Sequence, residues 1–250
     1  YKWKEGQGAS VYLDPSGYTG GNLRGGESGS NGLVLDTKGN LILCQHGDRR
    51  VARMLSSTSK PSSQFETLAG KFKGGRFNSP NDLVYNRKGE LYFTDPPYGL
   101  VKKEKDPKRE IDFQGVYLLR KSGKVDLVTK ELERPNGIIL SPDEKTLYVA
   151  NSHGPRPIWM AFDLKPNGLA KKGRVFFDTT AYRGKHPGRQ GGNDGLKVDK
   201  QGNLWATGPG GVLVFSPEGD HLGTILTGQR TANCAFGGDG STLYMTADMF

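Results

Sequence analysis

The feature that most limits how this chain can fold is a segment pattern that recurs along it at intervals of roughly 40 to 57 residues. Each copy begins with a polar amide or acid, continues with an apolar stretch and a turn rich in Gly, Asp and Lys, and ends with Leu followed by β-forming residues. The five copies begin at Asn31, Asn81, Asn136, Asp194 and Asn233. Self-similarity with a period of this size is typical of repeat architectures, in which each repeat is one supersecondary unit.

Each copy predicts a hairpin of two antiparallel strands. Turn-forming sequences such as Thr37-Lys38-Gly39-Asn40 separate two stretches with alternating apolar residues. Further strands are expected after most hairpins, at residues 51–54, 115–119, 157–162 and 211–215. Four strands per repeat are the signature of propeller blades. Helical periodicity is sustained nowhere, so the sequence predicts an all-β fold.

We therefore predict one domain over residues 1–250, an all-β, six-bladed β-propeller. Complete blades are expected at residues 31–70, 80–130, 135–180 and 193–227, and an incomplete blade from residue 232. Strands at residues 1–3 and 10–13 are assigned to the outer part of the first blade. The inner strands of the first blade and the outer strands of the last are expected to be missing from this chain, since an unclosed ring leaves strand edges open.

The charge of the chain raises the question of nucleic-acid binding. Its formal net charge is +9 at pH 7, but its longest basic stretch, residues 101–110, is interleaved with acids and a proline. Such a stretch is typical of a solvated loop, and no RNP string or helix-turn-helix accompanies it. No apolar run approaches the roughly 18 residues of a membrane helix. We expect neither nucleic acid nor a membrane as a partner, and we expect Cys44 and Cys234 to be buried, unbridged thiols.

The shared first position of the five copies predicts a site on the propeller axis. The first strand of every blade lines the central channel, so residues at one repeat position converge there. Four amides and one carboxylate, Asp194, form an oxygen-rich and nearly neutral set of the kind that Ca²⁺ or Mg²⁺ accepts, and no Cys or His shares the position. An alternative is that Asn and Asp before Gly serve as turn formers. Two copies, at Asn81 and Asn233, lack that glycine.

Residues that follow each second strand are predicted to form a rim around this site, because they lie on the same face as the start of the first strand. The rim segments are residues 45–48, 94–98, 151–153, 207–209 and 247–248. The candidates for binding substrate hydroxyl groups are His46, Asp95, Tyr98 and Asn151, together with Asn81 in the channel. The sequence has no G-x-S-x-G elbow and no phosphate-binding loop.

These residues resemble the family of gluconolactonases and senescence marker protein (regucalcin) over essentially the whole chain. The most specific strings are Ser79-Pro80-Asn81-Asp82-Leu83, Arg134-Pro135-Asn136-Gly137-Ile138 and Asn193-Asp194-Gly195-Leu196-Lys197. The string Cys44-Gln45-His46-Gly47-Asp48 is similar to the microbial gluconolactonase branch in particular.

The resemblance implies a divalent cation, usually calcium and sometimes zinc or magnesium, held by one Glu, one Asn and one Asp. The Asn matches Asn136, the Asp matches Asp194, and a nearby channel Asn matches Asn81. The family Glu lies in an early motif that is expected upstream of Tyr1. Ser79 stands where animal members have a substrate-binding arginine, so the same sugar specificity does not follow.

The implied activity is hydrolysis of a small sugar lactone, such as gluconolactone, to its aldonic acid. In this hypothesis the cation polarises the lactone carbonyl, and Asp194 is the catalytic residue that orients or deprotonates the attacking water. The alternative is a propeller that binds a ligand or a protein without catalysis, because a fold alone does not fix a function.

Overall fold

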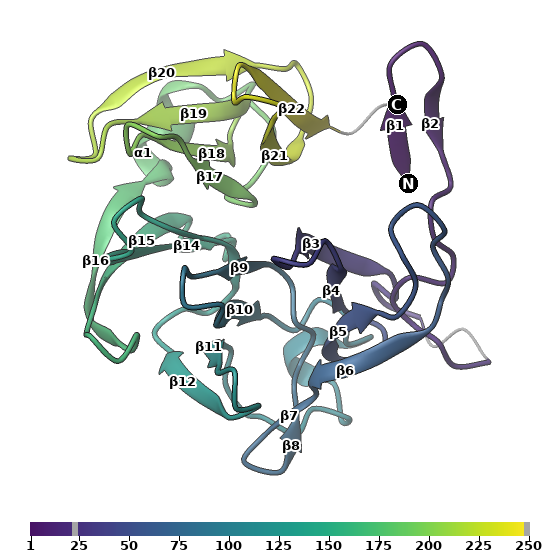
Figure 1. The fold of residues 1–250 in the computed structure, drawn as a ribbon. Coiled ribbons are helices and arrows are strands. Elements are labelled where there is room, and N and C mark those ends of the chain that lie inside the picture. Colours follow the sequence, from purple (N-terminus) through teal and green to yellow (C-terminus); the bar gives the residue numbers. More distant parts are fainter. Residues whose placement is uncertain (22–24, 248–250) are drawn as a thin grey trace.

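The chain winds through successive antiparallel sheets arranged around a central axis (Figure 1). The computed structural model describes residues 1–21 and 25–247. Four of the sheets have four strands each, and within each sheet neighbouring strands are also neighbours in the sequence. This arrangement is that of propeller blades. The predicted all-β propeller is confirmed.

The four complete blades lie where the repeat predicts them. Their strands are β3 (Ser30–Leu35), β4 (Leu41–Gln45), β5 (Arg50–Met54) and β6 (Phe65–Ala69); β9 (Leu83–Tyr85), β10 (Leu91–Asp95), β11 (Gly115–Leu119) and β12 (Val125–Thr129); β13 (Pro135–Leu140), β14 (Thr146–Asn151), β15 (Ile158–Leu164) and β16 (Ala170–Asp178); and β17 (Leu196–Val198), β18 (Leu204–Gly208), β19 (Gly211–Phe215) and β20 (His221–Leu226). The shared first position therefore stands at or just before the innermost strand of each blade, as predicted.

Three further sheets have two strands each. They pair β1 (Lys2–Lys4) with β2 (Gly8–Ser10), β7 (Lys71–Phe72) with β8 (Gly75–Arg76), and β21 (Thr231–Gly237) with β22 (Thr242–Ala247). The strand expected at residues 10–13 is wrong, because β2 ends at Ser10. Tyr12 and Leu13 instead pack against the core side chains of Leu41, Leu43 and Met54, which explains an apolar run without strand pairing.

The described residues also include one short helix, α1 (Thr179–Lys185), and one 3-10 turn (Lys103–Lys105). The helix is too short to leave a periodic signal in the sequence, although Asp178 marks its start by accepting a hydrogen bond from the Thr180 amide at 2.8 Å. None of the helices among the described residues has the length and apolar character needed to cross a membrane.

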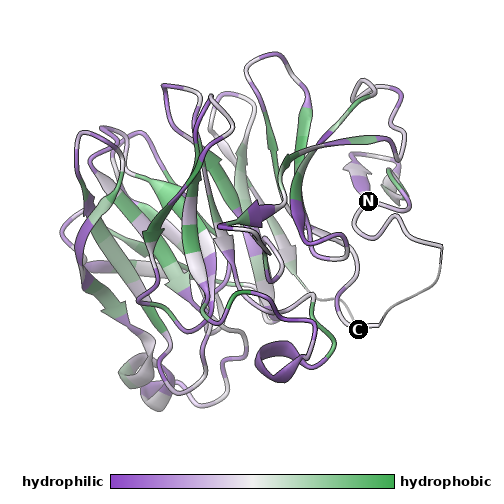
Figure 2. Ribbon diagram, turned by 90° about the horizontal axis from the view of Figure 1, so that it is seen from below, coloured by the Kyte–Doolittle hydropathy of each residue, from purple (hydrophilic) through white to green (hydrophobic). Residues whose placement is uncertain are grey.

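The hydrophobic core lies between neighbouring blades. Figure 2 shows hydrophobic residues along the strands and hydrophilic residues in most of the loops that join them. One core cluster joins the first two complete blades through Phe77, Phe93 and Tyr117, whose rings pack with centroids 5.0 to 5.4 Å apart. Similar clusters join the second blade to the third and the third to the fourth. The same packing recurs between each pair of neighbouring complete blades, and it fixes the position of their inner strands around the axis.

Neighbouring inner strands approach each other closely at the glycine that follows the shared position. A Cβ atom on Gly137 would lie 2.2 Å from the backbone oxygen of Asp194, and one on Gly32 would lie 2.6 Å from that of Asn81. The Gly32 amide donates to the Asn81 carbonyl at 2.6 Å. These glycines therefore serve strand packing around the axis, rather than the turn that is the alternative explanation of Asn-Gly and Asp-Gly pairs.

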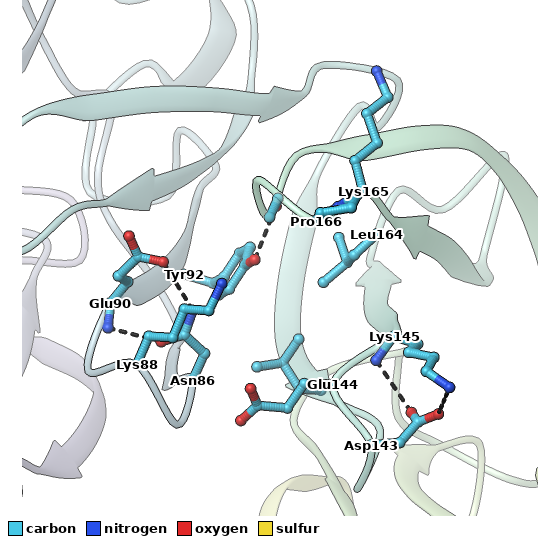
Figure 3. A pocket seen from close by; sticks show the side chains of 12 residues that line it. Asn86, Lys88, Glu90, Tyr92, Asp143, Glu144, Lys145, Leu164, Lys165 and Pro166 are labelled. Carbon is cyan, nitrogen blue, oxygen red and sulfur yellow. Dashed lines mark hydrogen bonds and ion pairs between the residues drawn. The ribbon is translucent and has the colours of Figure 1, made fainter.

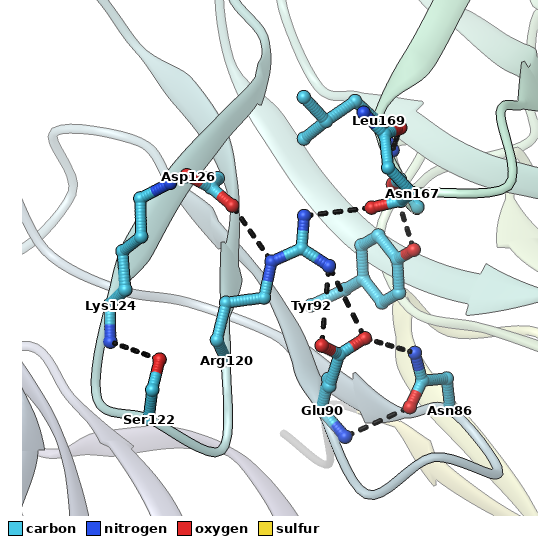
Figure 4. Close-up of polar contacts among 10 residues, drawn as sticks. Asn86, Glu90, Tyr92, Arg120, Ser122, Lys124, Asp126, Asn167 and Leu169 are labelled. Atoms are coloured by element: carbon cyan, nitrogen blue, oxygen red, sulfur yellow. Dashed lines mark hydrogen bonds and ion pairs between the residues drawn. The ribbon is translucent and has the colours of Figure 1, made fainter.

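A network around Arg120 ties the second complete blade to the third (Figure 4). The guanidinium donates to the carboxylates of Asp126 at 2.7 Å and Glu90 at 3.2 Å, and to the backbone oxygen of Asn167 at 2.7 Å. The Tyr92 hydroxyl donates to Gly168 in the same turn of the third blade at 2.8 Å. Since Asn167 and Gly168 join β15 to β16, these bonds cross between blades.

We expect an Arg120→Ala substitution to lower the free energy of unfolding by roughly 1–3 kcal/mol, because it removes the one donor that two carboxylates and a carbonyl of the neighbouring blade share. Urea denaturation measures this change. Arg174→Ala is the matched control, since Arg174 pairs with Asp163 at 2.8 Å on the exposed surface. Its cost should stay below about 0.5 kcal/mol. Equal losses in the two variants would show that the Arg120 network does not stabilise the contact between blades.

Candidate active site

A cavity opens where four of the five predicted channel residues converge. Its volume is about 240 Å³, and it is lined by Glu27, Asn31, Asn81, Tyr98, Asn136, Ser152, Gly192, Asn193 and Asp194. The four channel residues come from four successive blades. Each stands at or just before the innermost strand of its blade, which is β3, β9, β13 or β17. Convergence of polar groups in one cavity is the usual mark of a binding site.

Two amides at the bottom of the cavity are linked to each other. The Asn81 side-chain nitrogen donates to the Asn136 side-chain oxygen at 3.0 Å, and the Asn136 nitrogen donates to the Ser152 hydroxyl at 2.8 Å. Asn81 is 1% exposed and Asn136 is 7% exposed. The side-chain oxygen of Asn81 is buried and makes no hydrogen bond to any described residue. This bond pattern leaves an amide oxygen available to a ligand.

Asp194 supplies a carboxylate beside these amides. Burial, and after it the charge of Asp82, raises the pKa of Asp194 to about 7, although a hydrogen bond with Asn136 acts to lower it. No cationic side chain of the described residues lowers this pKa. The carboxylate therefore lies in a place that favours a positive charge brought by a ligand.

The fifth channel residue, Asn233, is placed differently. It lines a neighbouring hollow of about 440 Å³ that it shares with Asn31 and Asp194. Its side-chain oxygen accepts hydrogen bonds from the Cys234 amide at 2.8 Å and from the Lys197 ammonium at 3.5 Å. The expectation that all five residues share one cavity is thus met by four of them, because the oxygen of Asn233 is turned toward its own strand and Lys197.

Tyr98 is the member of the four rim candidates whose side chain lines the cavity. Burial raises the pKa of its phenol to about 12, so the hydroxyl stays protonated and can donate or accept a hydrogen bond. A hydrogen bond with Ser152 connects it to the amides at the bottom of the cavity.

His46 lies behind the cavity wall. Its side chain is 2% exposed, and its Nδ1 atom lies 3.4 Å from the Glu27 carboxylate, which does line the cavity. Its ring centroid is 6.4 Å from that of Tyr98. His46 therefore lies next to the site but does not line the cavity, and its contact with the cavity runs through Glu27.

The two remaining rim candidates, Asp95 and Asn151, do not face the cavity. Both are fully buried. The Asp95 carboxylate accepts hydrogen bonds from the amides of Asn78 at 2.8 Å and Ser79 at 2.7 Å, and the Asn151 side-chain oxygen accepts one from the Arg134 amide at 2.8 Å. Neither side chain lines the cavity, so this geometry does not support their prediction as substrate-binding residues. In these two blades, the last residue of the second strand instead accepts hydrogen bonds from the segment that leads into the first strand.

We expect an Asp95→Ala substitution to destabilise the protein by roughly 2–4 kcal/mol, because it leaves the buried backbone amides of Asn78 and Ser79 without the carboxylate that accepts their hydrogen bonds. Thermal denaturation measures the change. An Asp36→Ala substitution is the control, since Asp36 caps an exposed hairpin turn through Lys38 and Asn40 and should cost about 1 kcal/mol. If Asp95→Ala were as stable as the parent chain but lost substrate affinity, the structural role of Asp95 would be refuted.

A second hollow lies beyond the hairpin turns, at the opposite end of the inner strands (Figure 3). Its volume is about 380 Å³, and charged side chains surround it. Several of these groups are already paired: Lys145 with Asp143, Glu90 with Arg120, and the Tyr92 hydroxyl with Gly168. Among the described residues, four of the predicted channel residues line the other cavity and none of the five lines this hollow.

Two polar residues that line the cavity, Glu27 and Asn193, were not predicted from the sequence as site residues, whereas Ser152 belongs to the predicted rim segment 151–153. Glu27 precedes β3 in a glycine-rich loop, Ser152 follows β14, and Asn193 precedes Asp194. Ser152 donates to the Asn193 carbonyl. A usable signal existed for Glu27, which is an acid four residues before a channel position. Of the rim segments, residue 248 lies outside the described residues.

Both cysteines, Cys44 and Cys234, are buried free thiols, as predicted. Burial raises the pKa of the Cys234 thiol to about 11 and that of Cys44 well above its usual range. Neither thiol is therefore available as a nucleophile near neutral pH.

Comparison with known proteins places this geometry in context. Residues 3–248 match the family described as the SMP-30/gluconolactonase/LRE-like region. The chain is 39% identical to a gluconolactonase of Zymomonas mobilis over 98% of its own length and 69% of that protein. It is 27% identical to a lactonohydrolase of Aspergillus oryzae over 69% of the chain and 43% of that protein. A solved gluconolactonase structure from Xanthomonas campestris has a TM-score of 0.75 and 32% identity over 88% of this chain and 69% of that one.

Proposed function

Because the chain belongs to the SMP-30/gluconolactonase/LRE-like family, we propose that it is a hydrolase that opens a small sugar lactone, such as gluconolactone, to its aldonic acid. The observation that carries the proposal is the cavity on the propeller axis, where Asn81, Asn136 and Asp194 bring amide and carboxylate oxygens together. Similarity to a gluconolactonase over 98% of the chain supports the choice of lactone hydrolysis among the reactions such a site could perform.

We propose one divalent cation as the cofactor, with calcium favoured and magnesium or zinc as alternatives. The residues fit such an ion, because the Asn81 side-chain oxygen is buried without a hydrogen-bond partner among the described residues and no cation neutralises Asp194. Asn81, Asn136 and Asp194 would hold it. All three offer oxygen atoms, which hard cations prefer, and no Cys or His lines the cavity.

A bound divalent cation supplies Lewis-acid polarisation of the lactone carbonyl. Asp194 orients the attacking water and accepts its proton. The water oxygen forms a bond to the carbonyl carbon, the bond between that carbon and the ring oxygen breaks, and the ring oxygen receives the proton that Asp194 took from the water. The product is the open-chain aldonic acid.

The remaining lining residues are suited to hold the sugar. Tyr98 and Ser152 both offer hydroxyl groups to the cavity. A hydrogen bond joins Tyr98 to Ser152, and Ser152 in turn accepts one from Asn136. Positioning of this kind keeps the carbonyl carbon close to the attacking water. The substrate contacts of Asn81 and Tyr98 therefore follow from their place in the cavity, while His46 acts through Glu27.

We also propose that the propeller has six blades. Four complete sheets, the β21–β22 pair and the β1–β2 pair together account for parts of six. Trp3 of β1 packs against Tyr244 of β22 with ring centroids 6.0 Å apart. Leu33 and Leu35 on β3 are 54% and 55% exposed, which is the apolar surface that a neighbouring blade covers in a closed propeller.

The proposed activity is tested by following acid release from gluconolactone at constant pH in the presence of calcium. We expect the purified protein to accelerate the reaction well above the rate in buffer alone. A rate equal to that of buffer alone, with a folded and calcium-saturated protein, would favour a propeller that binds a ligand or partner without catalysis.

A further inference from the structure

We propose that Glu27 determines the substrate class of this site by accepting hydrogen bonds from the hydroxyl groups of a polyhydroxylated lactone. The inference rests on the proposed lactone-hydrolysing function and adds a residue to it. Glu27 lies in the loop before β3 and lines the same cavity as Asn81, Asn136 and Asp194.

Glu27 stands at the mouth of the cavity, whereas the channel amides form its floor. The Glu27 side chain is 57% exposed, compared with 1% for Asn81 and 7% for Asn136. If the carbonyl group of a lactone contacts the buried amides of the floor, the substituents on its ring lie near Glu27 at the mouth. In a sugar lactone those substituents are hydroxyl groups.

A buried histidine contacts the Glu27 carboxylate from behind. The Oε2 atom of Glu27 lies 3.4 Å from Nδ1 of His46, which is almost completely buried. The His46 amide donates to the Gly29 carbonyl at 3.1 Å, and a Cβ atom on Gly99 would lie 2.7 Å from the His46 carbonyl. His46 is thus a positioning residue, because it fixes the carboxylate without lining the cavity.

The charge state of Glu27 suits this role. A hydrogen bond with His46 lowers the pKa of Glu27, and the charges of His46 and Lys103 lower it too, while partial burial opposes them. An ionised carboxylate only accepts hydrogen bonds, and bonds from hydroxyl donors to it are stronger than bonds between neutral groups.

The rest of the lining favours the same substrate class. Apart from the ring of Tyr98 and the backbone of Gly192, it consists of amide, hydroxyl and carboxylate side chains, and no aliphatic side chain is among them. An alkyl-substituted lactone would leave these groups without partners, which is costly in a closed site. A polyol satisfies them.

The test compares two lactones of equal ring size in the calcium-loaded protein, gluconolactone and δ-valerolactone, which has no hydroxyl groups. We expect Glu27→Gln to reduce kcat/KM for gluconolactone by about 10- to 100-fold, mainly through KM, since the loss is one of charge-assisted bonds. The value for δ-valerolactone should stay within about twofold. Inhibition by 1,5-anhydroglucitol, which has the hydroxyl pattern without the carbonyl, should weaken in parallel.

Two controls isolate the role of Glu27. Glu66→Gln changes an acid that pairs with Arg53 on the outer strand β6, and it should leave both lactones unaffected. His46→Gln should raise KM for gluconolactone with little effect on δ-valerolactone. Calcium affinity, measured by calorimetry, should be the same in Glu27→Gln and the parent chain.

Three outcomes would overturn the inference. Equal losses on both lactones would place Glu27 in the reaction itself, a tenfold loss of calcium affinity would make it a cation ligand, and unchanged kinetics and inhibition would remove it from substrate binding. A parent chain that hydrolyses neither lactone is a different result, since it rejects the proposed function and the inference with it.

Discussion

An Asp194→Asn variant is expected to hydrolyse gluconolactone about 10²- to 10⁴-fold more slowly than the parent chain while keeping its fold. The substitution preserves shape and one oxygen, but it removes the charge that accepts a proton from water. Stability should not fall, because the Asp194 carboxylate is buried without a cationic partner among the described residues and its pKa is raised to about 7. Steady-state kinetics and thermal denaturation measure the two effects separately.

The matched control for this variant is Asp48→Asn. Asp48 accepts hydrogen bonds from Thr19 at 2.7 Å and Arg50 at 2.9 Å outside the cavity, so its replacement should change activity by less than about tenfold. Near-parental activity of Asp194→Asn with calcium present would refute the role of this carboxylate and would favour a non-catalytic propeller.

A Gly137→Ala substitution is expected to lower the free energy of unfolding by at least about 3 kcal/mol. The added methyl group would lie 2.2 Å from the Asp194 backbone oxygen and 2.9 Å from the Gly195 Cα atom. Backbone atoms cannot yield as the end of a flexible side chain can, so two inner strands must separate. The separation also moves Asn136 away from Asp194, and activity should fall with stability.

Gly223→Ala provides the comparison, because Gly223 also lies in a strand, β20, and a Cβ atom there would meet nothing within 4 Å. Its stability should stay within about 0.5 kcal/mol of the parent chain. Urea denaturation of both variants gives the difference directly. If Gly137→Ala unfolded at the same urea concentration as Gly223→Ala, close strand contact around the axis would not be what requires glycine.

The repeat allowed the blades and the floor of the site to be predicted from the sequence. A residue at one register of an inner strand has little freedom in direction, so Asn31, Asn81, Asn136 and Asp194 converge once the blades are recognised. The glycine after the shared position follows from the same geometry, although the sequence alone did not separate strand packing from turn formation.

The rim was harder to predict, because the regular alternation of side-chain directions along a strand ends with the strand. Asp95 ends β10 and Tyr98 follows three residues later, yet Asp95 accepts hydrogen bonds from a backbone segment and Tyr98 lines the cavity. Glu27 lines the site from a loop, where its carboxylate contacts His46. Asn233 deviates because Lys197 lies next to its side chain. Each of these placements depends on contacts between distant segments, which residue spacing does not encode.

The central claim is that a divalent cation on the propeller axis is required for lactone hydrolysis. The most direct measurement is the rate of acid release from gluconolactone by protein stripped with a chelator, before and after stepwise addition of calcium. We expect a rate no higher than that of buffer for the stripped protein and full recovery at one bound calcium per chain. Hydrolysis at the full rate in excess chelator would contradict the claim.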